Sequence, residues 1–323
     1  MLSNTAKACP VALPRKKSSP QVELPAVKEQ WLTSAGFSYA YKAFEVQGDS
    51  KPPTLMLFGA FQSFQSWNGF VKAFLAQGRS VLLLALPGTG ESEPLPPEYD
   101  IEFLADSIRL LLDHVGLEKA SIIAPSYSSP AAYSFAQQHP GRIRNLQLCG
   151  TMQRIPAPLT PYVERSISLM EEGNMEQFAS EVLGLTGPSA GHGLLCADPS
   201  KVIARRKLAL RILYSQLLNL SNDDKLRYKY NTYRLLRQRS FDLEHPPAVP
   251  VLMFTGEHDT FTEASLCRRI AAHIPEARFT TILEADHMFH LEQFDTTAEL
   301  FYRFSQELPL HDLPGISALE DVR

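Results

Sequence analysis

The chain has 323 residues, enough for one large α/β domain with an insertion or for two smaller domains. Its hydrophobic content of 44% can supply a core, and its formal net charge of −4 argues against a general nucleic-acid-binding protein. No apolar run approaches the about 18–20 residues that a membrane-spanning helix needs. The four cysteines show no paired spacing, which favours reduced thiols in a cytoplasmic protein over a disulfide framework or a zinc site.

The two ends of the chain are expected to lie outside the core. Residues 1–28 are rich in Pro, Ser and Lys and carry a basic run with no apolar segment behind it, which predicts a disordered tail rather than a secretory signal. Residues 309–323, with a Pro-Gly pair and several acidic residues, are expected to form a similarly loose C-terminal tail. Ordered structure should begin near Trp31, with an exposed antiparallel hairpin over residues 37–46.

Between these tails, short apolar strands alternate with amphipathic helices, which predicts a parallel sheet covered on both faces. The expected strands are 54–58, 81–86, 121–124, 143–148, 249–254 and 279–283, with helices at 67–76, 101–115, from about 127, at 264–273 and from 297. Residues 151–246 are different, because they carry helical patterns without obvious strands. The sequence therefore predicts an α/β core of residues 29–150 and 247–308, interrupted by a helical lid at 151–246.

Ser126 lies where the strand 121–124 gives way to helix. This is the position of a nucleophile elbow, usually Gly-x-Ser-x-Gly, in which a strained turn holds the serine hydroxyl above the sheet. The two glycine positions hold Ala124 and Ser128, so the motif alone is weak, and Ser126 alone would be a helix N-cap. Ser128 is a poorer nucleophile candidate, because the strand would have to continue through Pro125, which has no N–H.

Two later strands end in the partners that a serine nucleophile needs. A serine hydroxyl requires a general base within hydrogen-bond reach. Asp259 follows the strand 249–254 and His287 follows the next strand, which is the order Ser, acid, His that accompanies such an elbow. Taken singly, Asp259 would be a turn residue and His287 a loop histidine. Together, at the ends of three strands, they predict a catalytic triad of Ser126, Asp259 and His287.

An acyl-transfer site also needs donors for an oxyanion. The expected donors are the backbone amides of Tyr127, which follows the nucleophile, and of Ala60 in the loop after the first long strand, with Phe61 as the fallback. His258 and His290 are interpreted as packing or surface residues. A metal site built from these two and His287 lacks the HExxH spacing, so no metal is expected.

A glycine-containing loop at residues 86–92 resembles a dinucleotide-binding fingerprint. It lacks the third glycine, and no helix begins directly behind it. The loop is therefore interpreted as a tight structural turn, and no cofactor is expected.

These motifs resemble the α/β-hydrolase fold superfamily over about residues 30–308. Within it the chain is most similar to bacterial enzymes that handle β-hydroxyacyl chains on acyl carrier protein. These are the synthase that makes the lipid dimer of rhamnolipids and the related hydroxyacyl transacylase or thioesterase. The similar stretches are 55–60, 162–165, 252–262 and 287–292. The elbow departs from that group, which has Ser-Trp-Gly-Gly where this chain has Ser126-Tyr-Ser-Ser129.

The resemblance implies that Ser126 forms an acyl-enzyme with a fatty acyl thioester and that water or a β-hydroxyacyl hydroxyl accepts the acyl group. Two alternatives stay open: a carboxylesterase with a small apolar pocket and, because of the altered elbow, a non-catalytic binding protein on a hydrolase scaffold.

The expected lid is basic between residues 201 and 239, where only Asp223 and Asp224 are acidic. Its cations are Lys201, Arg205, Arg206, Lys207, Arg211, Lys225, Arg227, Lys229, Arg234, Arg237 and Arg239. Such a surface would suit an anionic acyl carrier protein or the phosphates of coenzyme A, although a solvated helical surface explains it equally well. The interleaved apolar residues at 208–218 could line an acyl tunnel or belong to an ordinary core.

Overall fold

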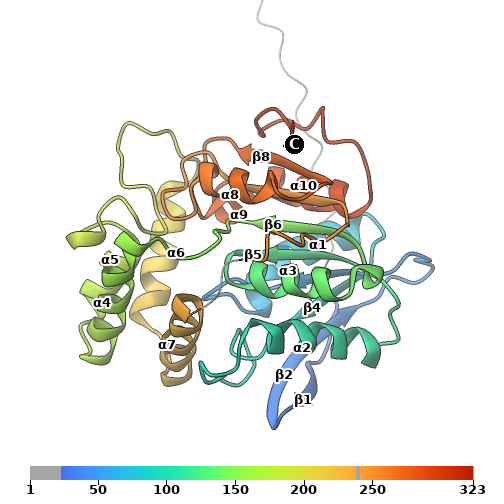
Figure 1. The fold of residues 1–323 in the computed structure, drawn as a ribbon, viewed down its shortest axis with the longest axis horizontal. Helices are drawn as coiled ribbons and strands as arrows, with labels where there is room; N and C mark the ends of the chain where they lie inside the picture. Colours follow the sequence, from blue (N-terminus) through green and yellow to red (C-terminus); the bar gives the residue numbers. More distant parts are fainter. Residues whose placement is uncertain (1–22, 238–240, 323) are drawn as a thin grey trace, which may run out of the picture.

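A nine-stranded sheet forms the centre of the computed structural model, which describes residues 23–237 and 241–322 (Figure 1). The strand order is β1-β2-β4-β3-β5-β6-β7-β8-β9; β4 to β8 run parallel, and β1, β2 and β9 join antiparallel at the edges. The strands are β1 (Gln30–Ser34), β2 (Phe37–Phe44), β3 (Thr54–Leu57), β4 (Val81–Leu84), β5 (Ala120–Pro125), β6 (Ile143–Cys149), β7 (Val251–Gly256), β8 (Ala277–Ile282) and β9 (Glu320–Asp321). The predicted α/β fold class is confirmed.

Helices cover both faces of this sheet, because its central strands are apolar along their whole length. Strands β3, β4 and β5 are buried at every residue. Helices α2 and α3 and the later α8 pack on one face, and α1 and α10 pack on the other. These helices, with the short α9, are α1 (Phe64–Ala76), α2 (Ile101–His114), α3 (Ser129–Gln138), α8 (Ala264–Ala271), α9 (Phe289–Glu292) and α10 (Phe294–Ser305).

The stretch between β6 and β7, here called the inserted segment (residues 151–246), carries four α-helices in its described part. They are α4 (Thr160–Glu171), α5 (Met175–Val182), α6 (Arg206–Leu218) and α7 (Asn222–Arg237). Figure 1 shows them together on one side of the sheet, at the left. They share a separate apolar cluster that includes Leu169, Phe178 and Leu213, and Met288 of the main sheet's loops joins it.

A hairpin is present at the start of the ordered chain, but it does not lie within residues 37–46 as expected: residues 37–44 form the single strand β2, which pairs with the earlier strand β1. Strand β2 is also less exposed than its alternating pattern suggested. Strand β2 pairs with β4, and Tyr39, Ala40 and Tyr41 are buried. Pairing with the parallel sheet on one side and packing against α2 exclude water from this strand.

The expectation of a loose C-terminal tail is wrong. Leu310 and Leu313 are buried in the core that α1 and α10 form, and β9 pairs with β8. Arg268 of α8 donates two hydrogen bonds of 2.8 Å to the Glu320 carboxylate. The two leucines and this ion pair anchor the segment despite its Pro-Gly pair.

The predicted disordered tail, residues 1–28, lies mostly outside the described residues. Within residues 23–28, Leu24 and Val27 pack partly buried against the same core. That contact contradicts a tail that is disordered as far as residue 28.

Candidate active site

Ser126 occupies a strained turn between β5 and α3. Its φ is 46°, in the left-handed region that costs a non-glycine residue about 1–3 kcal/mol. Phe61 (φ 60°) and Glu284 (φ 53°) are strained in the same way in the loops after β3 and β8. Such strain clusters at functional sites. The three loops that the sequence analysis assigned to the oxyanion, the nucleophile and the histidine therefore each carry one strained residue.

The serines that replace the elbow glycines fit the turn without strain. Ser128 and Ser129 have φ values of −82° and −56°, which any residue adopts. Both side chains are fully buried. The Ser128 hydroxyl donates to the Pro125 carbonyl at 3.0 Å and the Ser129 hydroxyl to the Ala124 carbonyl at 2.8 Å. The two hydroxyls thus satisfy the last carbonyls of β5.

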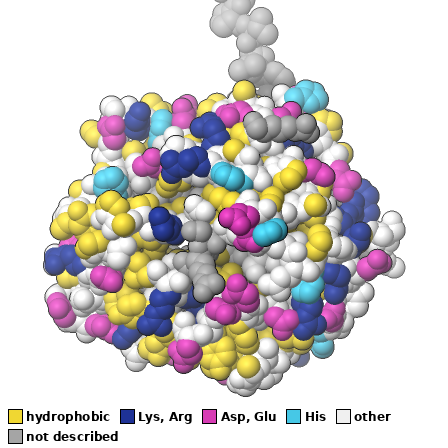
Figure 2. Space-filling model, viewed as in Figure 1, with side chains coloured by type: hydrophobic (Ala, Val, Ile, Leu, Met, Phe, Trp, Pro, Cys, Tyr) yellow, Lys and Arg dark blue, Asp and Glu magenta, His cyan; other side chains and the backbone are white. Residues whose placement is uncertain are grey.

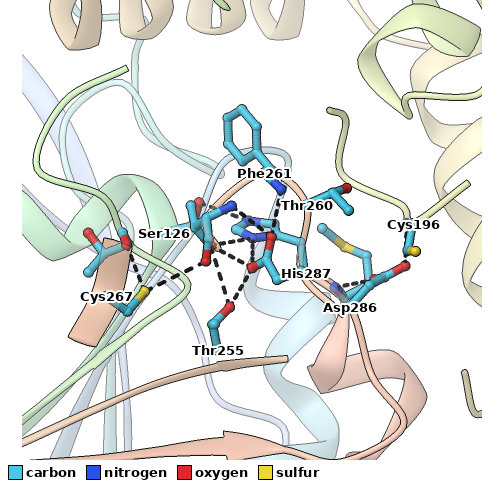
Figure 3. Close-up of polar contacts among 12 residues, drawn as sticks. Ser126, Cys196, Thr255, Thr260, Phe261, Cys267, Asp286 and His287 are labelled. Carbon is cyan, nitrogen blue, oxygen red and sulfur yellow. Dashed lines mark hydrogen bonds and ion pairs between the residues drawn. The ribbon is translucent and has the colours of Figure 1, made fainter. Parts of the chain in front are cut away.

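The structure brings Ser126, His287 and Asp259 together in one hydrogen-bonded chain (Figure 3). Nε2 of His287 lies 3.2 Å from the Ser126 hydroxyl oxygen. On the other side of the ring, Nδ1 of His287 lies 2.8 Å from a carboxylate oxygen of Asp259. This is the geometry that a serine, a general base and an orienting acid need.

Asp259 is buried and receives donors on both oxygens. The Phe261 and Thr262 amides donate at 2.9 and 2.7 Å, and the hydroxyls of Thr255 and Thr262 donate to the second oxygen. Burial alone would raise the pKa of Asp259, but the charge of His287 and these hydrogen bonds lower it to about 2. The carboxyl group is therefore ionised at neutral pH and can accept from His287.

His287 is held by a close approach of two loops. Burial opposes its charged form, but the charges of Asp259 and Asp286 outweigh burial and raise its pKa above the ordinary value. At the end of β7, a Cβ on Gly256 would lie 2.1 Å from the Asp286 carbonyl oxygen. Only glycine permits that contact, which fixes the His287 loop against the Asp259 loop.

Ala60 and Tyr127, the expected oxyanion donors, both line the cavity that contains Ser126. Gln62, which the sequence analysis did not single out, holds the loop of Ala60. Its side-chain oxygen accepts from the Gly59 amide at 2.8 Å and from the Trp67 indole at 3.1 Å. Its side-chain nitrogen lies 3.4 Å from His290.

His290, which was interpreted as a packing or surface residue, is partly buried and lines the cavity. Burial, reinforced by the charge of His287, lowers its pKa to about 4. At neutral pH its ring is uncharged and can accept a hydrogen bond from Gln62. Within the described residues, His, Cys, Asp and Glu side chains do not gather in threes at a spacing that could hold a metal ion.

A cavity of about 590 Å³ lies above Ser126, between the loops of the sheet and the inserted segment. Its apolar wall includes Phe61, Val163, Leu213, Leu220, Tyr228 and Met288. This volume is in the range of small-molecule sites. Of the apolar residues at 208–218, Ile212 and Leu213 line the cavity, whereas Leu217 is buried in the cluster of the inserted segment.

The loop at residues 86–92 forms turns beside this cavity, and Gly88 (φ 82°) has the left-handed conformation that favours glycine. The carbonyl of Gly88 accepts from the Asn231 side chain of α7 at 2.7 Å. The loop thus serves as a contact between the sheet and the inserted segment.

Arg234, which the sequence analysis counted among the surface cations, is only 2% exposed. It donates to five acceptors, all of them hydroxyl or carbonyl oxygens: Tyr127, Asn231, Leu95, Pro96 and Tyr99, at 2.6–2.8 Å. The Tyr127 hydroxyl in turn donates to Asn231 at 2.9 Å. The residue after Ser126 is thus fixed to α7. Sequence periodicity could not reveal this, because the acceptors come from distant segments.

Comparison with known proteins agrees with the fold. Residues 52–294 match the model of the alpha/beta hydrolase fold, which covers more than half of the chain. The chain belongs to the α/β-hydrolase fold family.

Among curated relatives, epoxide hydrolase 4 of Mus musculus is 23% identical over 286 residues, 85% of this chain and 78% of the relative. The dihydrolipoyllysine-residue acetyltransferase component of the acetoin cleaving system of Pseudomonas putida is 24% identical over 258 residues, 77% of this chain. The chain spans 62% of that relative's length.

Among solved structures, the enol-lactonase of Burkholderia xenovorans LB400 has a TM-score of 0.68 at 22% identity, covering 86% of this chain and 100% of the other. A thermophilic esterase of Thermogutta terrifontis has a TM-score of 0.67 at 18% identity, covering 88% and 99%. These similarities establish the fold. Across the described ranges, the helices are all too short or too polar to cross a membrane.

Proposed function

We propose that the protein is a serine-dependent acyl-transfer enzyme that acts on fatty acyl esters or thioesters, β-hydroxyacyl thioesters in particular. The observation that carries the proposal is the hydrogen-bonded chain from Ser126 through His287 to Asp259, on a strained turn at the floor of a 590 Å³ cavity. The class agrees with the family, which includes hydrolases and esterases. The apolar cavity wall favours a substrate with a hydrocarbon chain.

In the proposed reaction, Nε2 of His287 takes the hydroxyl proton of Ser126 while the Ser126 oxygen attacks the acyl carbonyl carbon. The amides of Ala60 and Tyr127 donate to the resulting oxyanion. When the intermediate collapses, the bond to the leaving thiol or alcohol breaks, and His287 returns the proton to that group. Asp259 orients the imidazole throughout and stabilises its charged form.

The acyl-enzyme is then released by a second attack. Water or the hydroxyl of a β-hydroxyacyl group loses its proton to His287 and bonds to the acyl carbon. The bond to the Ser126 oxygen breaks, and that oxygen regains the proton. The inserted segment, which forms one wall of the cavity, is proposed to act as the lid that limits access of water.

An acyl carrier protein or coenzyme A is the proposed carrier of the acyl group. Of the basic residues expected on the lid, Arg234 is buried, Lys229 is paired with Glu171, and Arg239 lies outside the described residues. Four exposed cations precede α6 or lie on it and are proposed to meet an anionic carrier: Lys201, Arg205, Lys207 and Arg211.

Incubation with β-hydroxyacyl carrier protein, followed by mass spectrometry, tests the proposed reaction. We expect a free hydroxy acid or a hydroxyacyloxy acid together with a Ser126 adduct, and Ser126→Ala should lose at least roughly a thousandfold in rate. A fluorophosphonate probe should label the protein and fail to label Ser126→Ala. If the probe labels both proteins equally, or neither, Ser126 is not the nucleophile and a non-catalytic binding role is favoured.

The carrier is tested separately by reversing charge on α6. Lys207→Glu with Arg211→Glu should lower kcat/KM for the carrier-protein thioester and leave kcat/KM for a short soluble thioester unchanged. Equal effects on both substrates would contradict carrier docking there. Turnover of p-nitrophenyl esters without thioester activity would instead identify a carboxylesterase that uses the same three residues.

The three described cysteines, Cys149, Cys196 and Cys267, are buried and unpaired. Unpaired thiols support the proposal that the protein works in the reducing cytoplasm.

A further inference from the structure

Two buried carboxyl groups lie next to each other directly behind His287. Asp286 precedes His287 and is fully buried, and Glu292 ends α9 and is 2% exposed. One oxygen of Glu292, Oε2, accepts from the Asp286 amide at 2.8 Å, which places the Glu292 carboxyl group beside Asp286. The positive charge of Arg206 in α6 has a small opposing effect, which lowers the pKa of Glu292.

The donors around the pair favour Asp286 as the ionised carboxyl group. Asp286 receives the Met288 amide on Oδ1 at 2.8 Å and the Cys196 amide on Oδ2 at 2.9 Å. The Oε1 atom of Glu292 is buried and finds no donor within the described part of the chain. Two adjacent buried carboxylates cannot both be charged, and the group with fewer donors keeps the proton. Burial, together with the charge of Asp286, raises the pKa of Glu292 to about 9.

We propose that Glu292 is a carboxylic acid at neutral pH that donates its proton to Asp286, and that the Asp286 carboxylate held in this way is a positioning residue for His287. The shared proton follows from the acid pair alone. The positioning role rests on the function proposed above.

The geometry gives Asp286 three effects on the site. Through the Met288 amide, it closes the turn that follows His287. Through the Cys196 amide, it anchors the inserted segment to the His287 loop. Figure 3 shows this side chain on the far side of His287 from Ser126, directed toward Cys196. Its charge also joins that of Asp259 in raising the pKa of His287.

The shared proton has a direct spectroscopic test. An infrared band of a protonated carboxyl group should be present at pH 7 in the wild-type protein and absent in Glu292→Gln. Asp295→Asn, which removes an exposed acid of α10 just beyond α9, is the matched control and should retain the band. Absence of the band from the wild-type protein, or its persistence in Glu292→Gln, overturns the proposal.

Stability gives a second, independent readout. A carboxyl group whose pKa is raised on folding binds a proton more tightly in the native state, so stability falls as pH rises from the ordinary pKa toward the raised value. The wild-type Tm should therefore fall between about pH 5 and pH 9 more steeply than the Tm of Glu292→Gln, whose amide donates without titrating. Asp295→Asn should follow the wild-type slope. Parallel slopes for all three proteins would overturn the proposal.

The positioning role is tested by Asp286→Asn and by the choice of residue at 292. Asp286→Asn should lower kcat on the order of tenfold at nearly constant KM, because the imidazole is misplaced rather than the substrate. The acid limb of its pH–rate profile should shift to lower pH, because the pKa of His287 falls when the neighbouring charge is removed. Glu292→Gln should keep wild-type activity, whereas Glu292→Ala should lose activity as Asp286→Asn does.

These outcomes separate the two proposals. If Ser126→Ala is as active as the wild-type protein, the proposed function fails, while the infrared and Tm results still decide the shared proton. If Ser126 is the nucleophile but Asp286→Asn changes neither kcat nor the acid limb, the positioning role is wrong.

Discussion

Among the contacts that join the inserted segment to the sheet, two use buried groups of opposite charge and are here called the two ties. On one side, the Arg234 guanidinium of α7 is buried among neutral oxygens and holds Tyr127. On the other, the Asp286 carboxylate holds the Cys196 amide and is supported by Glu292. Arginine stays charged at every ordinary pH, whereas the acid pair shares a titratable proton. The first tie should therefore be independent of pH and the second should not.

The two ties also act on different residues of the candidate site. Arg234 acts on the residue that follows Ser126 and is an expected oxyanion donor, and Asp286 acts on the loop of His287. Helix α7 is a fixed wall of the cavity, because its contacts reach Tyr127 and the loop of Gly88.

Arg234→Met should have the largest effect of the substitutions that distinguish the two ties. It leaves the Tyr127 hydroxyl, Asn231 and three backbone carbonyls without their charged donor, which should cost about 3–5 kcal/mol of unfolding free energy. Urea unfolding measures this loss, and it should be the same at pH 6 and pH 9. Arg237→Met, on the exposed face of the same helix, should change stability by no more than about 0.5 kcal/mol.

A loss at Arg234 no larger than that at Arg237 would show that the buried guanidinium does not carry the tie. A loss that varies strongly with pH would remove the contrast with the acid pair.

The sequence predicted the α/β core and the three residues Ser126, Asp259 and His287 because these depend on local patterns. Apolar strands alternating with helices indicate the sheet, and chain order alone places the three residues at one edge of it. Their catalytic role stays a prediction. The ties were not predictable, because burial of Arg234 and Asp286 depends on contacts between segments about 90 to 139 residues apart.

Other differences have the same physical origin. His290 was interpreted as a packing or surface residue, but it lines a cavity that residues of the inserted segment also line. The C-terminal residues were expected to be loose, but Leu310 and Leu313 find an apolar site that α1 and α10 create. In each case a local signal of polarity or turn formation was outweighed by packing against a distant element.

Tyr127→Phe should have an intermediate effect and show how much of the Arg234 tie passes through one hydroxyl. The substitution leaves Arg234 without one acceptor and Asn231 without one donor, which should cost about 1–3 kcal/mol. Because Tyr127 follows Ser126, kcat should also fall, by roughly tenfold, through displacement of the elbow. Unfolding and steady-state kinetics measure the two quantities.

Tyr133→Phe in α3, the helix that follows the elbow, is the matched control, because its hydroxyl donates to the Asp242 carbonyl at 2.8 Å, away from the elbow. It should lose stability without losing kcat. Equal kcat for both variants and the wild-type protein would show that the α7 tie supports the fold but not the site.

Ser128→Gly should have the smallest effect, because Ser128 belongs to the elbow but to neither tie. The substitution removes the hydrogen bond to the Pro125 carbonyl and should cost about 1 kcal/mol. The φ of −82° does not require glycine, so restoring the residue that the usual motif has here should leave kcat unchanged. A large rise in kcat would instead mean that the serine hinders the elbow, and that the ties alone do not explain how Ser126 is positioned.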